Sequence, residues 1–267
     1  MSDTGLSKES CRQPNTMNAI EKTVSVIDYL SAKEAAFAEI QRDLGVPKAT
    51  LHRILQALEA HEFIEKDRVT DTYRLGLKFI YYGESVKGKT DLPYVVNDYL
   101  RGLSREIGET CCLSVLYQNT VLNLSSFEGD ESALTSRLLP LSPLNCSASG
   151  KIYLTHFSDD ALREYFSGSG PVKKTSNSIC TYEEFLEEKK NIIESGVSRD
   201  NEEYEYGLYC MSVPLHNHLG PMDATLGVTG PKARIFMKGV DDIEARLKGI
   251  AAVISEKLIK IKYIPEY

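Results

Sequence analysis

The chain has 267 residues, enough for two domains of ordinary size, and its hydrophobic content of 42% allows a well-formed core. No apolar run approaches the ~18 residues that a membrane-spanning helix requires. The polar N-terminus lacks the apolar segment of a secretory signal, so residues 1–17 are expected to form a flexible tail. We therefore expect a cytoplasmic protein without a membrane partner.

The net charge of −7 is unevenly distributed along the chain. Residues 1–90 contain 13 basic and 13 acidic residues, and the remaining 18 basic and 25 acidic residues carry the whole net charge. The N-terminal third is thus neutral overall, and one basic face on it is compatible with binding to nucleic acid.

Six cysteines are spread without a C-x-x-C motif, and a chain of this length needs no disulfides for stability. Two of them are adjacent and would point to opposite faces of a strand. Small buried thiols in a reducing compartment are therefore expected at Cys11, Cys111, Cys112, Cys146, Cys180 and Cys210.

The N-terminal region predicts helices separated by a tight turn. Apolar residues that recur every three to four positions indicate a first helix, with Ile20, Val24, Ile27 and Leu30 on one face. A second helix is expected over Phe37–Leu44, ended by Gly45 in the left-handed conformation. A third helix begins near Pro47 and buries Leu51, Ile54, Leu55 and Leu58.

The segment "FIEKDRVTDTYRLG" then predicts two short strands around a charged turn, Asp67 to Thr72. Helices joined by a tight turn and followed by a β-hairpin form a winged helix-turn-helix. We assign residues 18–76 to this module and residues 77–91 to a helical linker with an aromatic face, Phe79, Tyr81 and Tyr82.

Residues 92–267 alternate between helical and strand patterns. Helices are expected near 94–108, 147–156, 181–196 and 240–261, and a hairpin is expected around Gln118 and Asn119. Two longer strands, "GLYCMSVPL" and "MDATLGVTG", are joined by "HNHLGP". Strands gathered in one sheet with helices around it predict an α+β fold with an antiparallel sheet.

Three segments together resemble the IclR family of bacterial transcriptional regulators. They are "VPKATLHRILQALEAHEFIEK…YRLG", "LSPLNCSASGK", and "ESGVSRDNEEYEYGLYCMSVPL" followed by "GPMDATLGVTGP". The resemblance covers the chain from residue 18 to its end and implies a GAF/profilin-like effector-binding domain. The chain departs from the family at Asn145, where a His is common, at Ala148 and Ser149, and in "VTGP".

The third helix is the predicted DNA-reading element, because the major groove admits one helix and its first turn presents small and donor side chains. Arg53 is suited to guanine or phosphate, and Lys48 to phosphate. The wing supplies further basic groups for backbone or minor-groove contacts. The predicted DNA-binding residues are Lys48, Ala49, Thr50, His52, Arg53, Lys66, Arg68 and Arg74.

The resemblance also implies a pocket for a small molecule in the second domain. The free N–H groups that begin the helix at Ala148 and Ser149 favour a carboxylate, so a carboxylic or aromatic acid is the expected ligand. Asp200 is expected before the strand "GLYCMSVPL", and the acidic run Asp200, Glu202, Glu203 and Glu205 is interpreted as mostly solvated surface. The predicted effector-binding residues are Ser142, Ala148, Ser149, Asp200, Leu208, Cys210, Gly227 and Thr229.

Catalytic and metal sites are not predicted. "SASGK" is no phosphate-binding loop, because Asn145 replaces its first glycine and Ile152 follows Lys151. His216 and His218 are interpreted as exposed turn residues without a third metal ligand. We expect no cofactor and no enzyme. Two alternatives stay open: an enzyme that acts through Cys210 or Asp200, and a pocket filled by the protein's own side chains.

The expected partners are double-stranded DNA, a small-molecule effector and further copies of the chain. Two recognition helices about 34 Å apart would match half-sites one turn apart on a palindromic operator. The aromatic face of the linker is expected to pack against a partner subunit. The family resemblance implies a dimer of dimers.

Overall fold

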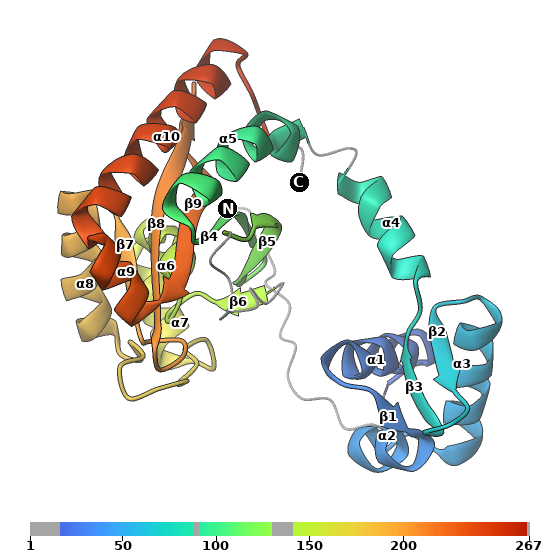
Figure 1. Ribbon diagram of the computed structural model, residues 1–267. Helices are drawn as coiled ribbons and strands as arrows, with labels where there is room; N and C mark the ends of the chain where they lie inside the picture. Colours follow the sequence, from blue (N-terminus) through green and yellow to red (C-terminus); the bar gives the residue numbers. More distant parts are fainter. Residues whose placement is uncertain (1–16, 88–90, 130–140, 266–267) are drawn as a thin grey trace, which may run out of the picture. The chain divides into compact units, whose positions relative to one another are not determined.

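The computed structural model describes residues 17–87, 91–129 and 141–265, and the chain divides near residue 90 into two compact units (Figure 1). The tail predicted for residues 1–17 lies outside the described residues, apart from Met17. The predicted α+β class, with a winged helix-turn-helix before an antiparallel sheet domain, is confirmed. The proposed boundaries at residues 18, 77 and 92 stay predictions.

The first unit packs three helices against a small antiparallel sheet (Figure 1). Asn18 caps its first helix, and Gly45, with a φ of 61°, ends the second. The four leucine and isoleucine side chains predicted for the third helix are buried. The elements are α1 (Ala19–Ala32), β1 (Ala35–Ala36), α2 (Phe37–Leu44), α3 (Lys48–Ala60), β2 (Ile64–Asp67) and β3 (Thr72–Leu75).

One prediction for this unit is partly wrong, and one strand was not predicted. On the predicted inner face of α1, Leu30 is buried and Ile27 packs against the core, but Ile20 is 75% exposed and Val24 is 49% exposed. The strand β1 was not expected, and its residue Ala35 pairs with Tyr73 at the free edge of β3. A two-residue strand has too few side chains to show a period of two, so its sequence carries no signal.

The helix α4 (Lys78–Lys87) follows the wing and packs partly on its own unit. The rings of Phe79 and Tyr82 lie 5.4 and 5.8 Å from the ring of Phe63. Phe79 and Tyr82 thus also contact their own unit, and the expectation that the aromatic face packs against a partner subunit stays a prediction. The exposed large hydrophobic residues of this segment are Leu77, Ile80, Tyr81, Tyr82 and Val86.

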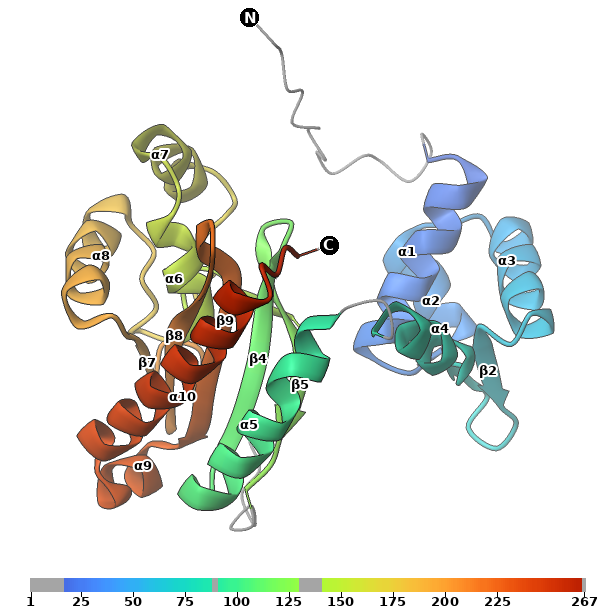
Figure 2. The same ribbon diagram turned by 90° about the horizontal axis from the view of Figure 1, so that it is seen from above.

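The second unit is a six-stranded antiparallel sheet with helices on both faces and the strand order β6-β5-β4-β9-β8-β7. Helices α5 and α10 lie side by side on one face, and α6 lies on the other (Figure 2). The helices are α5 (Asp91–Ile107), α6 (Ala148–Thr155), α7 (Asp159–Ser167), α8 (Tyr182–Ser195), α9 (Lys232–Lys238) and α10 (Val240–Lys260). The strands are β4 (Thr110–Tyr117), β5 (Thr120–Phe127), β6 (Leu141–Pro143), β7 (Ser198–Asn201), β8 (Leu208–Asn217) and β9 (Gly220–Pro231).

Four of these elements were not predicted: β6, α7, β7 and α9. The consequence for the site is that Asp200 does not precede a strand but lies on β7, directly opposite Cys210 of β8. Both histidines are exposed as expected, and His218 lies in the turn, but His216 belongs to β8.

A buried carboxylate fastens α9 to the start of β4. Glu109 accepts hydrogen bonds from Arg234 through both carboxylate oxygens, at 2.5 and 2.6 Å, and from Lys238 Nζ at 2.9 Å. Gly230 makes room for it, since a Cβ at this position would lie 2.4 Å from Glu109 Oε2. The arrangement joins the start of β4 to the segment that follows β9.

Replacing Glu109 by alanine should lower the free energy of unfolding by about 3–5 kcal/mol, because it leaves two largely buried cations without their shared anion. Glu106→Ala is the matched control, since that carboxylate is 53% exposed and pairs with Arg246 at the surface. Its loss should cost less than about 1 kcal/mol. Urea unfolding of both variants measures the difference, and equal losses would contradict the role given to Glu109.

Candidate DNA-binding surface and effector pocket

The predicted DNA-reading residues lie on the outer face of α3. Lys48, Ala49, His52 and Arg53 are exposed, and Thr50 is half-buried. No ion pair engages Lys48 or Arg53 within the described ranges. The first turns of α3 therefore present two unpaired cations, a hydroxyl and an imidazole beside small side chains.

The basic residues of the wing differ in their availability. Lys66 Nζ lies 2.6 Å from Asp71 Oδ1, and Arg74 Nη2 lies 3.0 Å from Glu65 Oε2. Arg68 is exposed, and the part of the chain described by the structure offers it no ion pair. Arg68 is thus the wing cation that needs no exchange of partner before it meets a phosphate.

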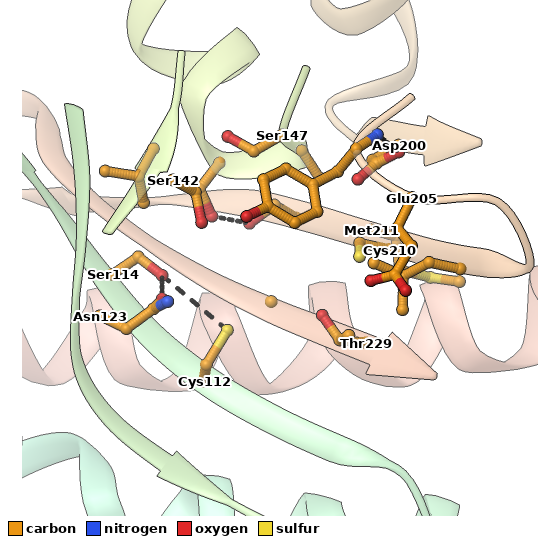
Figure 3. Close-up of a pocket in the computed structure, with 17 residues that line it drawn as sticks. Cys112, Ser114, Asn123, Ser142, Ser147, Asp200, Glu205, Cys210, Met211 and Thr229 are labelled. Carbon is orange, nitrogen blue, oxygen red and sulfur yellow. Dashed lines mark hydrogen bonds between the residues drawn. The ribbon is translucent and has the colours of Figure 1, made fainter. Parts of the chain in front are cut away.

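A pocket lies between α6 and the sheet of the second unit, and all eight predicted effector-binding residues line it (Figure 3). It holds about 620 Å³ of empty space, a volume that includes open solvent at its mouth. The predicted members are Ser142, Ala148, Ser149, Asp200, Leu208, Cys210, Gly227 and Thr229. The further lining residues are Cys112, Ser114, Val121, Asn123, Ser147, Tyr204, Glu205, Met211 and Ser212.

The side chains of the pocket floor form rows across the sheet, because residues paired on neighbouring strands lie next to one another. One row runs from Asp200 through Cys210 to Thr229. The next row on the same face joins Ser212, Gly227 and Cys112. A third row contains Thr225 and Ser114, followed by Asn123 on β5. Because Gly227 has no side chain, the middle row leaves a depression between Cys112 and Ser212.

A chain of hydroxyl groups fastens the first turn of α6 to this floor. Ser149 Oγ lies 2.8 Å from Ser212 Oγ and accepts from Thr225 Oγ1 at 2.9 Å. Tyr153 of the same helix donates to the carbonyl oxygen of Ser114 at 2.8 Å. These bonds engage the Ser149 hydroxyl, so its backbone amide is the group that it presents to a ligand.

The N-terminus of α6 has a side-chain cap that leaves two amides open. Ser147 accepts from the amide of Gly150 at 3.2 Å and donates to the carbonyl oxygen of Pro143 at 2.5 Å. The amides of Ala148 and Ser149 find no acceptor among the described residues. Two free N–H groups at a helix start are suited to an anion or a hydroxyl oxygen.

Lys151 is a fully buried cation behind the pocket. Its Nζ donates to Glu188 Oε1 of α8 at 2.8 Å, to the carbonyl oxygen of Arg199 at 2.6 Å, and to Glu203. Burial alone would lower the pKa of Lys151, but the two carboxylates outweigh it, and the pKa is raised. The interpretation of the acidic run as mostly solvated surface is therefore wrong for Asp200 and Glu203, which are both buried, and Glu203 pairs with Lys151.

The carboxyl groups next to Lys151 ionise with difficulty. Burial raises the pKa of Asp200 to about 6, although the amides of Glu203 and Tyr204 donate to its Oδ1 at 2.8 and 3.3 Å. Burial likewise raises the pKa of Glu203 to about 7, and its Oε2 has no hydrogen-bond partner among the described residues. A donor supplied by a ligand would favour the ionised form of Asp200.

Burial keeps the pocket thiols protonated. It raises the pKa of Cys112 to about 11, and burial together with the charge of Asp200 raises that of Cys210 well above its ordinary value. Adjacent Cys111 and Cys112 point to opposite faces, as predicted: Cys111 joins the apolar core and Cys112 lines the pocket. The five cysteines in the described ranges are unpaired, and Cys11 lies outside them.

The family departure at Asn145 lies outside the pocket. The buried Asn145 amide donates to the carbonyl oxygens of Val172 and Ile179 at 2.9 and 2.7 Å, and its Oδ1 accepts from the amide of Val172 at 2.9 Å. This side chain therefore holds the loop between α7 and α8, and it contacts no ligand site.

The part of the chain that the structure describes contains no candidate metal site and no candidate membrane-spanning helix. No group of three or more His, Cys, Asp or Glu side chains is placed to hold a metal ion there. No helix within the same ranges is long and apolar enough to cross a bilayer.

Comparison with family models covers most of the chain. The model described as the C-terminal domain of the bacterial transcriptional regulator IclR matches residues 85–256, and the IclR helix-turn-helix domain matches residues 19–68. The chain is 27% identical over 245 residues to the HTH-type transcriptional regulator XynR of Escherichia coli K12, a match that covers 91% of this chain and 97% of XynR.

Solved structures share the fold. The IclR protein of Thermotoga maritima superposes with a TM-score of 0.69 and 26% identity, over 91% of this chain and 99% of that one. An IclR homologue from Microbacterium hydrocarbonoxydans, complexed with 4-hydroxybenzoate, superposes with a TM-score of 0.74 and 19% identity. That superposition covers 90% of this chain and 99% of the homologue.

Asp200→Asn should stabilise the ligand-free protein at neutral pH. The folded state raises the pKa of Asp200 from 3.8 to about 6, so it binds the proton more tightly than the unfolded chain. Stability is therefore lost as pH rises from about 4 to about 6, on the order of 3 kcal/mol in all. The variant should escape this loss, because asparagine keeps an oxygen for the two backbone amides.

Urea unfolding between pH 4 and 8 checks this expectation. The stability difference between variant and wild type should grow up to about pH 6 and then stay constant, whereas the exposed control Asp160→Asn should show no such change. A variant less stable than wild type at pH 7 would show that ionised Asp200 stabilises the fold.

Proposed function

Because this chain belongs to the IclR family of bacterial transcriptional regulators, we propose that it is a ligand-responsive regulator that reads DNA with α3 and binds a small acid in the α6 pocket. The assignment as an IclR-type regulator with a DNA-binding and an effector domain rests on the two family models. The contacts to DNA and the class of ligand are the proposed parts. The observation that carries the ligand proposal is the meeting of all eight expected residues around one pocket.

The surface of α3 supports DNA recognition through Lys48, Thr50, His52 and Arg53. Its exposed cations have no internal partner in the described ranges, so neutralising phosphate charge requires no broken ion pair. Arg53, one helical turn into α3, is placed for guanine or phosphate, and Lys48 for phosphate. Arg68 is the wing residue most available for a backbone contact.

A dimer on a palindromic operator, and a dimer of dimers beyond it, are part of the proposal. The exposed side chains of Leu77, Ile80 and Tyr81 support it. Ile80 and Tyr81 lie on α4, and Leu77 lies in the turn directly before it. Exposed apolar patches commonly pair with another chain. Sedimentation of the full chain with and without operator DNA tests the assembly.

The proposal of an acidic ligand rests on the two backbone amides at the start of α6 that have no acceptor among the described residues. Ala148 and Ser149 offer two backbone donors at the positive end of the helix, which suits a carboxylate. Asp200 and Thr229 belong to the row of the pocket floor that runs from β7 through Cys210 to β9. Their oxygen atoms can form hydrogen bonds with hydroxyl groups of a ligand. The homologue complexed with 4-hydroxybenzoate is a further reason to propose an acid as ligand.

An enzyme that uses Cys210 or Asp200 is the second candidate function. The raised pKa of Cys210 weighs against it, because a thiol that stays protonated is a poor nucleophile. Incubation of the protein with candidate acids followed by mass spectrometry tests turnover. A product formed by the wild type and lost in Cys210→Ser would favour the enzyme.

Arg53→Ala should abolish binding to the protein's own promoter region, because it removes the charge placed for the groove, while the unfolding midpoint stays nearly unchanged. Arg105→Ala is the control, since it removes one exposed cation from α5 in the other unit. Gel shifts at low salt measure binding, and unfolding curves measure stability. Retained binding by Arg53→Ala, or its unfolding, would refute the surface assigned to α3.

Gly227→Val should close the pocket without disturbing the winged helix. A Cβ at Gly227 would lie 3.0 Å from Cys112 Sγ and 3.3 Å from Ser212 Oγ, so valine must occupy the depression in the floor. Small acids that raise the melting temperature of the wild type should not raise that of the variant. Gly102→Val, at a position with open space, should respond like wild type. An unaltered response in Gly227→Val would place the ligand elsewhere.

A further inference from the structure

A second cleft lies at the edge of the sheet, between the C-terminal half of α8 and the strand β7 (Figure 1). It shares no lining residue with the α6 pocket, so the two are separate cavities. The buried side chains of Val197 and Tyr209 give it an apolar wall. Glu188, Glu194 and Glu203 bring three carboxyl groups to the same cleft.

One of these carboxyl groups has a buried oxygen without a partner. Glu203 is 7% exposed, its Oε1 accepts from Lys151 Nζ, and its Oε2 has no hydrogen-bond partner among the described residues. An ionised oxygen requires a donor and a protonated one requires an acceptor, so the unpaired oxygen costs free energy in either state. A ligand that donates a hydrogen bond from the cleft would remove this cost.

The end of α8 adds negative potential to the cleft. The last carbonyl groups of a helix carry partial negative charge, and α8 has no basic residue in its last turn. Glu194 of that turn is exposed and forms no ion pair within the described ranges. Arg199 is the cation among the described lining residues, and Glu244 of α10 already pairs with it. The cleft is therefore suited to a cationic ligand.

The positions of the carboxyl groups favour an extended cation over a metal ion. Glu188 and Glu203 both bond to the ammonium group of Lys151, so they lie at one end of the cleft. Glu194 follows Glu188 by six residues on α8, which is roughly 9 Å along the helix axis. No group of three acidic, His or Cys side chains in the described part of the chain is placed to hold a metal ion. Two ammonium groups joined by a short alkyl chain would reach both ends.

We propose that this cleft binds an aliphatic diamine, a small polyamine in chemical class. One ammonium group donates to Glu203 Oε2, and the other pairs with Glu194 at the end of α8. The alkyl chain between them covers the apolar wall of Val197 and Tyr209. The site is a second ligand site, distinct from the α6 pocket and from the acid proposed to bind there.

Calorimetry and thermal shift on the full chain at physiological ionic strength test the site. The probes are putrescine, cadaverine and spermidine, compared with butylamine, butane-1,4-diol and magnesium chloride. At least one of the three polyamines should bind with a Kd below about 1 mM. Butylamine should bind at least about 10-fold more weakly, because it lacks the second charge, and the diol should not bind.

Two variants on the same helix test the carboxylate contacts. Glu194→Gln should weaken polyamine binding about 10-fold. Glu187→Gln is the matched control, since it removes the same charge from an 80% exposed position outside the cleft lining, and it should bind like wild type. Both positions are exposed, so neither variant depends on the buried network around Lys151.

The affinity should also depend on pH, because Glu203 must be ionised to accept an ammonium N–H. Burial raises the pKa of Glu203 to about 7, and the charged groups that face it are Lys151 of α6, Glu188 of α8 and Asp200 of β7. Binding should therefore be about 10-fold weaker at pH 6 than at pH 8. Folded Glu203→Gln should lose this dependence, whereas Glu194→Gln should keep it.

Three results would overturn the proposal. Butylamine or magnesium bound as tightly as the polyamines would show that the cleft attracts any cation. Equal losses in Glu194→Gln and Glu187→Gln would show attraction to the net charge of the protein alone. The absence of binding by all three polyamines would mean that water satisfies Glu203 and that the cleft is no polyamine site.

Discussion

The buried ammonium group of Lys151 is the interaction on which the pocket depends. It comes from the helix that forms the roof of the pocket and bonds to α8, to the backbone of β7 and to the loop that follows β7. A buried cation requires satisfied acceptors, so these three elements cannot separate from α6 without a large cost in free energy. The position of Asp200 on β7 and of the α6 amides above it follows from this one side chain.

The network also concentrates negative charge behind the pocket. Three carboxyl groups, those of Glu188, Asp200 and Glu203, lie close to one ammonium group, and burial raises the pKa of the latter two. At neutral pH, the ionisation of these groups thus makes the folded protein less stable than its packing alone would make it. A ligand that donates to Asp200 relieves part of this cost, and that differential free energy is what any shift between states of the protein requires.

Sequence reasoning identified residues that line the pocket more accurately than it placed the elements that carry them. The regular spacing of apolar residues was sufficient to predict α3 and α8. The family resemblance was sufficient to select eight residues that line the pocket. The period of two in "TCCLSV" also held a signal for Cys112 and Ser114 that was not used. Asp200 was placed before a strand because β7 is short and polar, and Glu203 was assigned to the surface because nothing local marks its distant partner Lys151.

Alternation along the strands lets the pocket change without disturbing the core. On β9, Leu226 and Val228 face the apolar core beneath α5 and α10, while Gly227 and Thr229 face the pocket. Successive side chains of a strand point to opposite faces, so a substitution at a pocket position leaves the core contacts of its neighbours in place. Such a sheet keeps one fold while its polar face is adapted to different ligands, which explains how the Ala148, Ser149 and "VTGP" departures coexist with an unaltered architecture.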